Sequence, residues 1–344
     1  MKVARPLCWL LPAMSASTLA VSGAAIAQKT ELLVHTALET DQIKAYEQAF
    51  TKAHPDIAIK WVRDSTGVIT SKLLAEKANP QADLVVGVSA SSLAVFDNEG
   101  MLLPYAPKGL DKISAKYRDP KNPPAWVGMD VYGSAICFNT VEAQKQGLPK
   151  PATWKDLLNP VYKGKIVMPN PASSGTGYLD VAAWIQMWGE AEAWKYMDAL
   201  HQNIAQYQHS GSKPCRQAGA GEFPIGLTFE YRAVTTKKSG APIDIIFPTE
   251  GLGWDLESSG IMKNTKKLDA AKKLMDWLAT PEAMELFSKN FAVVAVPGIA
   301  KPLDYVPADY EQRLTKNDFA WSAKNRDKIL AEWTKRYDAK SEKK

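Results

Sequence analysis

The chain has 344 residues, of which 42 are Lys or Arg and 37 are Asp or Glu, so its formal net charge is +5 at pH 7. These charges are dispersed along the sequence rather than gathered in blocks, which argues against nucleic acid as a partner. No run after residue 27 approaches the ~20 apolar residues of a membrane-spanning helix, and the chain is long enough for two domains.

The first 27 residues have the pattern of a secretory signal peptide. Lys2 and Arg5 form a basic start, small and apolar residues continue to Val21, and Ala25-Ile26-Ala27 is a small-x-small cleavage site. We therefore expect export to the periplasm, with 1–27 removed. No Cys follows the cleavage site, so we expect no lipid anchor.

Strand-like and helix-like segments alternate through the next hundred residues. Strands are expected at 31–35, 57–62 and 82–88, and each is followed by a short polar turn and a helical pattern. This alternation predicts an α/β fold with a mostly parallel sheet. The proline-rich stretch 104–124 is expected to be a long surface connection.

A second α/β unit is expected downstream. On the predicted strand 126–139, the polar residues Asp130, Tyr132 and Ser134 share one face. Further strands are expected at 223–229, 243–247 and 254–262, and helices at 179–188, 191–203, 268–279 and 281–289. Thr280 and Pro281 are the expected N-cap and first residue of the last of these helices. The final ~35 residues are charged and helical in pattern.

The stretch Pro169–Tyr178 joins a short apolar strand to a helix. Its Ser, Thr and Gly residues would point hydroxyls and backbone N–H groups at one spot beyond the helix N-terminus, which suits a small anion. It lacks the Lys of a phosphate-binding loop for nucleotides. An ordinary capped turn is an equally good interpretation of this segment alone.

Four other turns share this hydroxyl-rich or anion-friendly character. In open α/β sheets such turns gather at the carboxyl edge of the strands, where ligands bind. Two lobes facing each other across that edge would form a cleft lined by helix N-termini. With 173–177, the five turns are 36–39, 65–67, 89–91 and 210–212.

Carboxylates are expected at the same edge. Glu39 lies in the first turn, Asp130 on the connecting strand, and Asp255 and Glu257 share one face of the strand after Gly253. Next to a binding site for an anion, these carboxylates favour a solute that also carries a positively charged group. The alternative for each is an ordinary surface ion pair with Lys or Arg.

Signatures of catalysis are weak. The four histidines show no metal-ligand spacing, the cysteines of the exported chain, Cys137 and Cys215, form no CxxC pattern, and no G-x-S-x-G motif is present. We therefore expect no enzyme activity, no metal and no cofactor. A disulfide between Cys137 and Cys215 and a pair of free thiols are equally consistent with the sequence.

Four segments together resemble a known family, the periplasmic 2-aminoethylphosphonate-binding proteins of ABC importers, in the group of ferric-ion-binding and polyamine-binding proteins. The resemblance covers essentially the whole exported chain. The segments are 63–70 (Arg-Asp-Ser-Thr-Gly-Val-Ile-Thr), 168–177 (Met-Pro-Asn-Pro-Ala-Ser-Ser-Gly-Thr-Gly), 209–215 (His-Ser-Gly-Ser-Lys-Pro-Cys) and 250–255 (Glu-Gly-Leu-Gly-Trp-Asp).

The resemblance implies a two-lobed venus-flytrap fold of type II with two interlobe crossings, which closes on its solute. We expect lobe 1 to comprise 28–131 and 252–300, and lobe 2 to comprise 132–251 and 301–344, with the C-terminal helices on lobe 2. It also implies a membrane permease as partner. We expect a monomer.

Departures from the ferric relatives bear on the ligand. Those proteins bind iron through two consecutive tyrosines, where this chain has Tyr231-Arg232, and through a histidine that Glu39 replaces here. Since Arg is no ligand for Fe(III), iron is disfavoured. The polyamine relatives use acidic and aromatic residues near 254–257, which supports an amine site there, but a pure cation would leave the serine-rich turns unused.

The resulting hypothesis is reversible, non-catalytic capture of 2-aminoethylphosphonate, with Glu39 facing its ammonium group, assisted by Asp255 or Asp130. Rivals are a ferric-ion or polyamine receptor and a secreted hydrolase of phosphorylated amines. The phosphonate contacts are expected from Ser65, Thr66, Ser174, Gly175, Thr176 and Tyr231, and further contacts from Ser89, Ser173, Ser210 and Ser212.

Overall fold

A computed structural model describes residues 1–4 and 29–343 of the chain. The predicted signal peptide, apart from its first four residues, lies outside the described residues. Within the described part, no helix is long and apolar enough to cross a membrane.

The first part of the fold alternates strands and helices as the sequence pattern predicts. Its elements are β1 (Thr30–Thr36), α1 (Thr40–Ala53), β2 (Ile57–Arg63), α2 (Thr66–Ala75), β3 (Leu84–Ser89), α3 (Ala90–Asn98), β4 (Leu102–Leu103) and β5 (Val127–Asn139). The proline-rich connection before β5 contains two short 3-10 turns, Leu110–Lys112 and Ala115–Tyr117.

The second part contains elements that the sequence pattern did not predict, namely α4, β7 and α8. Its elements are α4 (Thr140–Gln146), 3-10 turns at Lys155–Leu158 and Pro160–Tyr162, β6 (Ile166–Pro169), α5 (Gly175–Trp188), α6 (Glu190–Asn203), β7 (Ile204–Gln208), α7 (Lys213–Ala220), β8 (Ile225–Phe229), α8 (Glu230–Lys238), β9 (Ile243–Ile246) and β10 (Trp254–Met262).

The chain ends in helices. These are α9 (Leu268–Leu278), α10 (Pro281–Phe287), α11 (Tyr310–Arg313), α12 (Phe319–Tyr337) and a final 3-10 turn, Asp338–Lys340. As predicted, Thr280 caps α10: its side chain accepts a hydrogen bond from the backbone N–H of Ala283, and Pro281 is the first helical residue.

The strands form one mixed sheet in the order β2-β1-β3-β10-β5-β8-β6-β7. The prediction of a mostly parallel sheet was wrong. β1 pairs in parallel with β2 and β3, and β6 with β7 and β8, but β5 and β10 run antiparallel to all their neighbours. The reason is that β5 carries the chain from the first parallel unit to the second, whose strand β8 runs against it, and β10 returns the chain to the first unit, so it runs against both β3 and β5.

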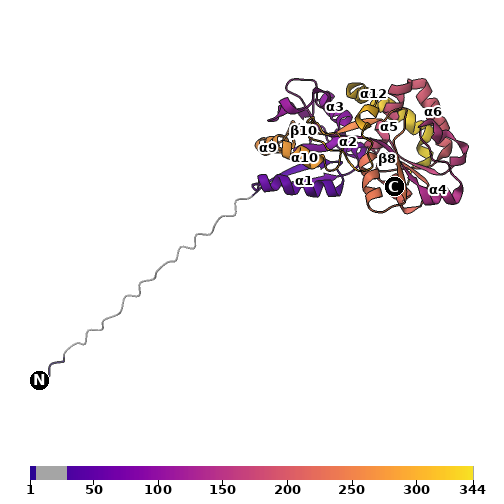
Figure 1. The fold of residues 1–344 in the computed structure, drawn as a ribbon. Coiled ribbons are helices and arrows are strands. Elements are labelled where there is room, and N and C mark those ends of the chain that lie inside the picture. Colours follow the sequence, from indigo (N-terminus) through magenta and orange to yellow (C-terminus); the bar gives the residue numbers. More distant parts are fainter. Residues whose placement is uncertain (5–28, 344) are drawn as a thin grey trace.

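The strand β5 connects the two halves of the structure. Its first half pairs with β10 through residues 127–133, and its second half pairs with β8 and β9 through residues 134–139. Helices α1, α9 and α10 gather at one end of the molecule, and α4 and α6 at the other (Figure 1). One hydrophobic core centres on Val34, Phe50 and Trp277, and a second on Trp154 and Trp184. The fold is thus two-lobed.

The helix α12 contacts both lobes. It packs against α3 of the first lobe, and its buried Trp333 and Tyr337 belong to the core of the second. The carbonyl oxygen of Ser322 also accepts a hydrogen bond of 2.6 Å from the Tyr178 hydroxyl on α5. The prediction that the C-terminal helices pack on lobe 2 is therefore incomplete for α12. The lobe boundaries themselves stay a prediction.

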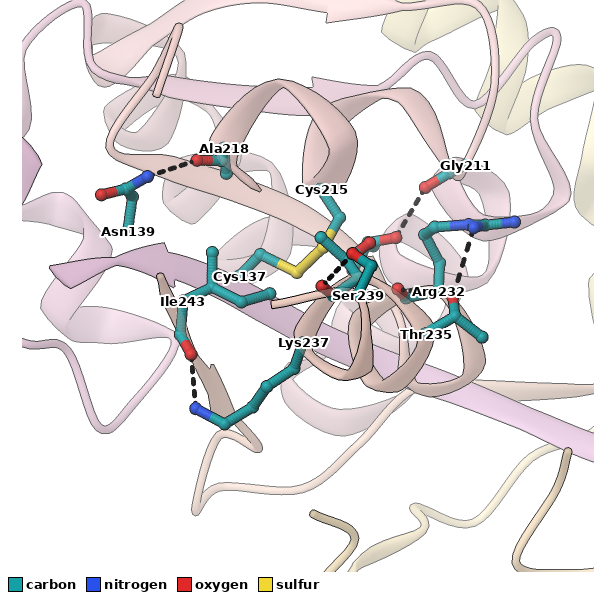
Figure 2. The surroundings of a disulfide bond; sticks show 12 residues. Cys137, Asn139, Gly211, Cys215, Ala218, Arg232, Thr235, Lys237, Ser239 and Ile243 are labelled. Atoms are coloured by element: carbon teal, nitrogen blue, oxygen red, sulfur yellow. Dashed lines mark hydrogen bonds between the residues drawn. A yellow bond between two sulfur atoms is a disulfide. The ribbon is translucent and has the colours of Figure 1, made fainter. Parts of the chain in front are cut away.

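Cys137 and Cys215 form a disulfide with a Cα–Cα distance of 5.4 Å, which settles the question that the sequence left open. The bond ties α7 to β5 (Figure 2). Close by, the Asn139 amide donates a 2.7 Å hydrogen bond to the carbonyl oxygen of Ala218, on the same helix. The N-terminus of α7 is thereby held at a fixed place on the sheet.

Candidate functional site

Five helices begin at one cavity. Their N-cap residues all line it: Glu39 for α1, Ser65 for α2, Ser89 for α3, Ser174 for α5 and Ser212 for α7. Strands β1, β2, β3 and β6 each end just before one of these turns, so the sheet brings the turns together. The cavity has a free volume of about 50 Å³, which suits one small chemical group.

The helix N-termini face the cavity with backbone N–H groups that have no partner within their own helices. The hydroxyls of Ser65, Ser89 and Ser212 accept no hydrogen bond from their own helices. The first N–H groups of a helix have no partner within it, and they carry the positive end of the helix dipole. An oxyanion in this cavity would therefore meet both N–H and O–H donors.

The two lobes touch each other beside the cavity. The backbone N–H of Gly67 at the start of α2 donates a 2.9 Å hydrogen bond to the carbonyl oxygen of Ser173, before α5. A Cβ atom added to Gly175 would lie only 2.8 Å from the hydroxyl oxygens of Ser89 and Thr66. This approach is possible because glycine has no side chain, and it corresponds to a closed conformation.

Three arginines surround Glu39 at one side of the cavity. Oε2 of Glu39 lies 3.0 Å from Nη2 of Arg232, 3.2 Å from Nη2 of Arg216 and 3.4 Å from Nη2 of Arg63. The Ser212 hydroxyl donates to Oε1 of the same carboxylate. Three guanidinium groups and one carboxylate leave an excess of positive charge, which favours an anion nearby.

Carboxyl groups form another part of the wall and the layer behind it. Glu257 lines the cavity; Asp130 and Glu230 lie wholly buried behind it. Burial raises the pKa of Glu230 to about 8. Burial first, and then the charges of neighbouring carboxylates, raise the pKa values of Asp130 and Glu257 well above their usual range. The cavity is therefore bordered both by arginines, which contact Glu39, and by carboxyl groups.

Comparison with known proteins identifies the family. A family model described as bacterial extracellular solute-binding protein matches residues 79–325, well over half of the chain. A protein of uncharacterised function from Haemophilus influenzae is 34% identical over 281 residues, which cover 81% of each chain. The chain belongs to the solute-binding protein family. A probable ABC transporter periplasmic-binding protein, y4fP of Sinorhizobium fredii, is 27% identical over 73% of this chain and 69% of its own.

Solved structures agree with this assignment. The periplasmic binding protein AfuA of Actinobacillus pleuropneumoniae, with fructose-6-phosphate bound, superposes with a TM-score of 0.84 at 28% identity and covers 90% of this chain and 99% of its own. Iron-bound HitA of Pseudomonas aeruginosa is 19% identical, with a TM-score of 0.74 over 88% and 99% of the two chains, and shows the fold alone. The protein is a solute-binding protein of ABC importer type, a class that binds without catalysis.

Nine of the residues predicted from the sequence line the cavity of this binding protein, and four do not. The five predicted turns all reach the cavity. The nine are Glu39, Ser65, Thr66, Ser89, Ser174, Gly175, Thr176, Ser210 and Ser212. The four outside it are Ser173, Tyr231, Asp130 and Asp255. Contact of the nine with a solute stays a prediction.

Tyr231 and Ser173 are directed elsewhere by specific contacts. The Tyr231 hydroxyl donates to Asp41 on α1, and its ring lies against Phe291 with centroids 5.4 Å apart. Ser173 donates a 2.7 Å hydrogen bond to the carbonyl oxygen of His209. Both side chains therefore support contacts around the cavity instead of presenting their oxygens to it.

The two aspartates are buried on β5 and β10 and do not line the cavity. Asp255 accepts a 2.6 Å hydrogen bond from the Ser91 hydroxyl and a 2.7 Å bond from the backbone N–H of Leu256. Burial raises its pKa to about 6. Asp130 stands opposite Glu257 on the neighbouring strand. The three arginines around the cavity pair with Glu39 and with neither aspartate.

Sequence reasoning missed most of the charged surroundings. Arg63 and Tyr132 line the cavity, and Arg216 and Arg232 bind Glu39 from the second lobe. Arg63 could have been found, because it stands at the end of β2 next to a predicted turn. Arg232 was noted in the sequence only as a departure from the ferric tyrosine pair. Neither it nor Arg216 carries a local signal for contact with Glu39, since α7 and α8 reach Glu39 only through the closed tertiary arrangement.

The assignment of Glu39 to an ammonium group has a physical difficulty. Its carboxylate already accepts hydrogen bonds from Ser212 and Arg216 and lies in ion-pair distance of two further arginines. An ammonium there would face three like charges. Glu257 is in the cavity wall without such partners and suits a cation better.

Proposed function

We propose that this binding protein captures a small organophosphorus anion, with 2-aminoethylphosphonate as the first candidate, and delivers it to the permease of an ABC importer. The observation that carries the proposal is the convergence of five helix N-termini on a small cavity, with three arginines around the Glu39 carboxylate in its wall. A tetrahedral oxyanion can take several N–H and O–H donors at once.

The phosphonate end is assigned to the contact between the lobes. Ser65 and Thr66 belong to the first lobe, and Ser174, Gly175 and Thr176 to the second. A solute bridging these turns would stabilise the closed form, because its oxygens would bond both lobes. Arg63 in the lining would add a charge-assisted contact.

The ammonium end is assigned to Glu257. Its side chain faces the cavity, and its two oxygens are 3.2 and 3.4 Å from Nε2 of Gln42. A phosphonate held among the helix N-termini and an ammonium held at Glu257 use both the donors and the carboxyl group of the cavity lining. A simple phosphate would use only the donors, and a polyamine only the carboxyl group.

A sugar phosphate is the second candidate. The specific observation that favours it is the fructose-6-phosphate in the AfuA structure, which is 28% identical to this chain. Its phosphate would occupy the same helix N-termini, and its hydroxyls would donate hydrogen bonds to Glu257 and accept them from Gln42.

Iron and hydrolysis receive less support from the same residues. Tyr231, which stands where ferric relatives are expected to hold iron, bonds Asp41 and does not line the cavity. In residues 29–343, no three His, Cys, Asp or Glu side chains gather in a metal-binding arrangement. The four histidines of the chain, His35, His54, His201 and His209, do not line the cavity, so no imidazole stands ready to activate one of its serines.

Calorimetric titration of the exported, solute-free protein tests the proposal. 2-Aminoethylphosphonate should bind more tightly than ethylphosphonate by about ten- to a hundredfold, because it adds a charge-assisted bond of about 1.5–3 kcal/mol. Spermidine should not bind. Phosphorus NMR of the recovered solute should show no inorganic phosphate, since inorganic phosphate would point to a hydrolase.

The comparison of two ligands separates the two candidates. Tighter binding of fructose-6-phosphate than of 2-aminoethylphosphonate would replace the first candidate by the second. Failure of all phosphorus solutes to bind would overturn the proposal.

Two variants test the residues assigned to the phosphonate group. Thr176→Val removes a hydroxyl of the cavity lining and should weaken all phosphorus ligands by a similar factor, roughly 10- to 100-fold for one hydrogen bond to a charged group. Thr249→Val changes an exposed threonine outside this cavity and should leave affinities unchanged.

A further inference from the structure

Two carboxyl groups face each other across neighbouring strands at the floor of the cavity. Asp130 of β5 and Glu257 of β10 are direct partners in the antiparallel register, and side chains at such positions lie on the same face with Cβ atoms about 4.5–5.5 Å apart. Glu257 lines the cavity, whereas Asp130 is wholly buried behind it. One carboxyl group is thus in reach of a solute, and the other is in reach of the first.

This carboxyl pair lacks a counter-charge. Neither oxygen of Asp130 has a hydrogen-bond donor among the described residues, and the donor to Glu257 is the neutral Gln42 amide. Within residues 29–343, no Lys, Arg or His forms an ion pair with either group. Two buried carboxylates at this separation cannot both stay ionised without a cation.

The other titratable groups around the pair do not supply one. Glu230 of α8 and Glu39 of α1 act on the pair as further acids. The phenols around it are Tyr46 of α1, Tyr132 of β5, Tyr231 of α8 and Tyr310 of α11, and the pKa of each is raised, chiefly by burial. The arginines nearby are engaged by Glu39. The pair is therefore surrounded by acidic and neutral groups.

We propose that Asp130 and Glu257 share one proton in the unliganded site, and that this proton leaves to solvent when the ammonium group of the solute docks on Glu257. This inference rests on the proposed function and identifies the two carboxyl groups that recognise the cationic end of the solute. An ammonium brings one positive charge and three N–H donors. It replaces the shared proton as the counter-charge of the pair, so the net charge of the floor is the same before and after binding.

The shared proton makes the carboxyl pair selective for an aminated solute. Ethylphosphonate brings no cation, so the pair keeps its proton when that ligand binds. A sugar phosphate brings only neutral hydroxyls, and it too leaves the proton in place. Proton release from the floor is therefore a signature of the amine.

The test is a proton count by calorimetry at pH 7 in buffers of different ionisation enthalpy. The slope of the observed enthalpy against the buffer enthalpy gives the protons exchanged per solute bound. Phosphonates can change their own ionisation on binding, so each count is compared between the wild type and Asp130→Asn. In that variant the amide donates to Glu257, which is then ionised before the solute arrives.

With 2-aminoethylphosphonate, the wild type should release about one proton more than Asp130→Asn, as one proton is all that the pair shares. With ethylphosphonate, the two proteins should give the same count. Asp269→Asn changes an exposed aspartate to the same amide and should match the wild type with both ligands.

A second variant keeps the test informative if Asp130→Asn does not fold. Glu257→Gln keeps the size of the side chain, and its count with 2-aminoethylphosphonate should also fall by about one proton. Its affinity for that ligand should drop close to its affinity for ethylphosphonate. Equal counts in the wild type and in either folded variant would overturn the shared proton while leaving the proposed function intact. Absence of 2-aminoethylphosphonate binding by the wild type would overturn both.

Discussion

A methyl group at Gly67 should block closure of the two lobes. The Cβ of Gly67→Ala would lie 2.3 Å from the carbonyl oxygen of Ala172 and 2.7 Å from the carbonyl carbon of Ser173. Both are backbone atoms of the opposite lobe, so they cannot rotate away as a side chain would. The lobes would have to separate by about 1 Å to restore ordinary contact.

The cost follows from what this separation removes. Overpacking of this kind costs about 1–3 kcal/mol, and the 2.9 Å hydrogen bond from Gly67 to Ser173 is worth about 0.5–1.5 kcal/mol. The closed form should lose about 2–4 kcal/mol, which lowers affinity roughly 30-fold to several hundredfold. The open form should not suffer, because alanine favours a helix over glycine by about 1 kcal/mol.

Calorimetry and small-angle scattering together check this prediction. Gly67→Ala should bind every ligand of the wild type more weakly, and its radius of gyration should shrink less on ligand addition. Ser71→Ala, an exposed position on the same helix, is the matched control and should behave as the wild type. Unchanged affinity of Gly67→Ala would refute the idea that this contact between α2 and the Ala172–Ser173 turn belongs to the bound state.

Three further predictions concern the charges and the disulfide. Glu39→Gln should weaken the binding of 2-aminoethylphosphonate and of ethylphosphonate alike in calorimetry, by about 10- to 100-fold, because Glu39 joins arginines of both lobes. A loss of affinity confined to the aminated ligand would instead indicate that Glu39 binds the ammonium group. Replacing Cys137 and Cys215 by Ser should lower the free energy of unfolding in urea by about 4 kcal/mol, given their separation of 78 residues, and equal midpoints would contradict this. Burial raises the pKa of Asp180 to about 8, so the native state holds a proton that the unfolded chain has lost above about pH 4. Its contribution to stability is full below that pH and is lost as pH rises towards 8, by up to about 1.4 kcal/mol per unit; Asp180→Asn should flatten this slope in urea titrations at pH 5 and pH 8, and an unchanged slope would count against it.

The sequence alone determined the local structure around the site. Hydrophobic period and turn residues are local signals, and they placed β1 to β3, the strand β5 and the helix starts after each polar turn within a few residues. The same logic placed each turn at the carboxyl end of its strand. The turns after β1–β3 and those after β6 and β7 meet because these two sets of strands run in opposite directions towards each other. The capping pair Thr280 and Pro281 is local for the same reason.

The tertiary structure decided strand direction and the partners of charged side chains. The antiparallel course of β5 and β10 depends on how the chain returns between lobes, which no short window of sequence records. Tyr231 follows a strand and was expected in the site, but the close approach of α1 gives its hydroxyl a partner in Asp41. Arg216 lies 177 residues from Glu39 in the sequence, and only lobe closure brings them within 3.2 Å. Side-chain direction and charge pairing are set by such long-range contacts, so the sequence could predict where a solute is held but not which groups balance its charge.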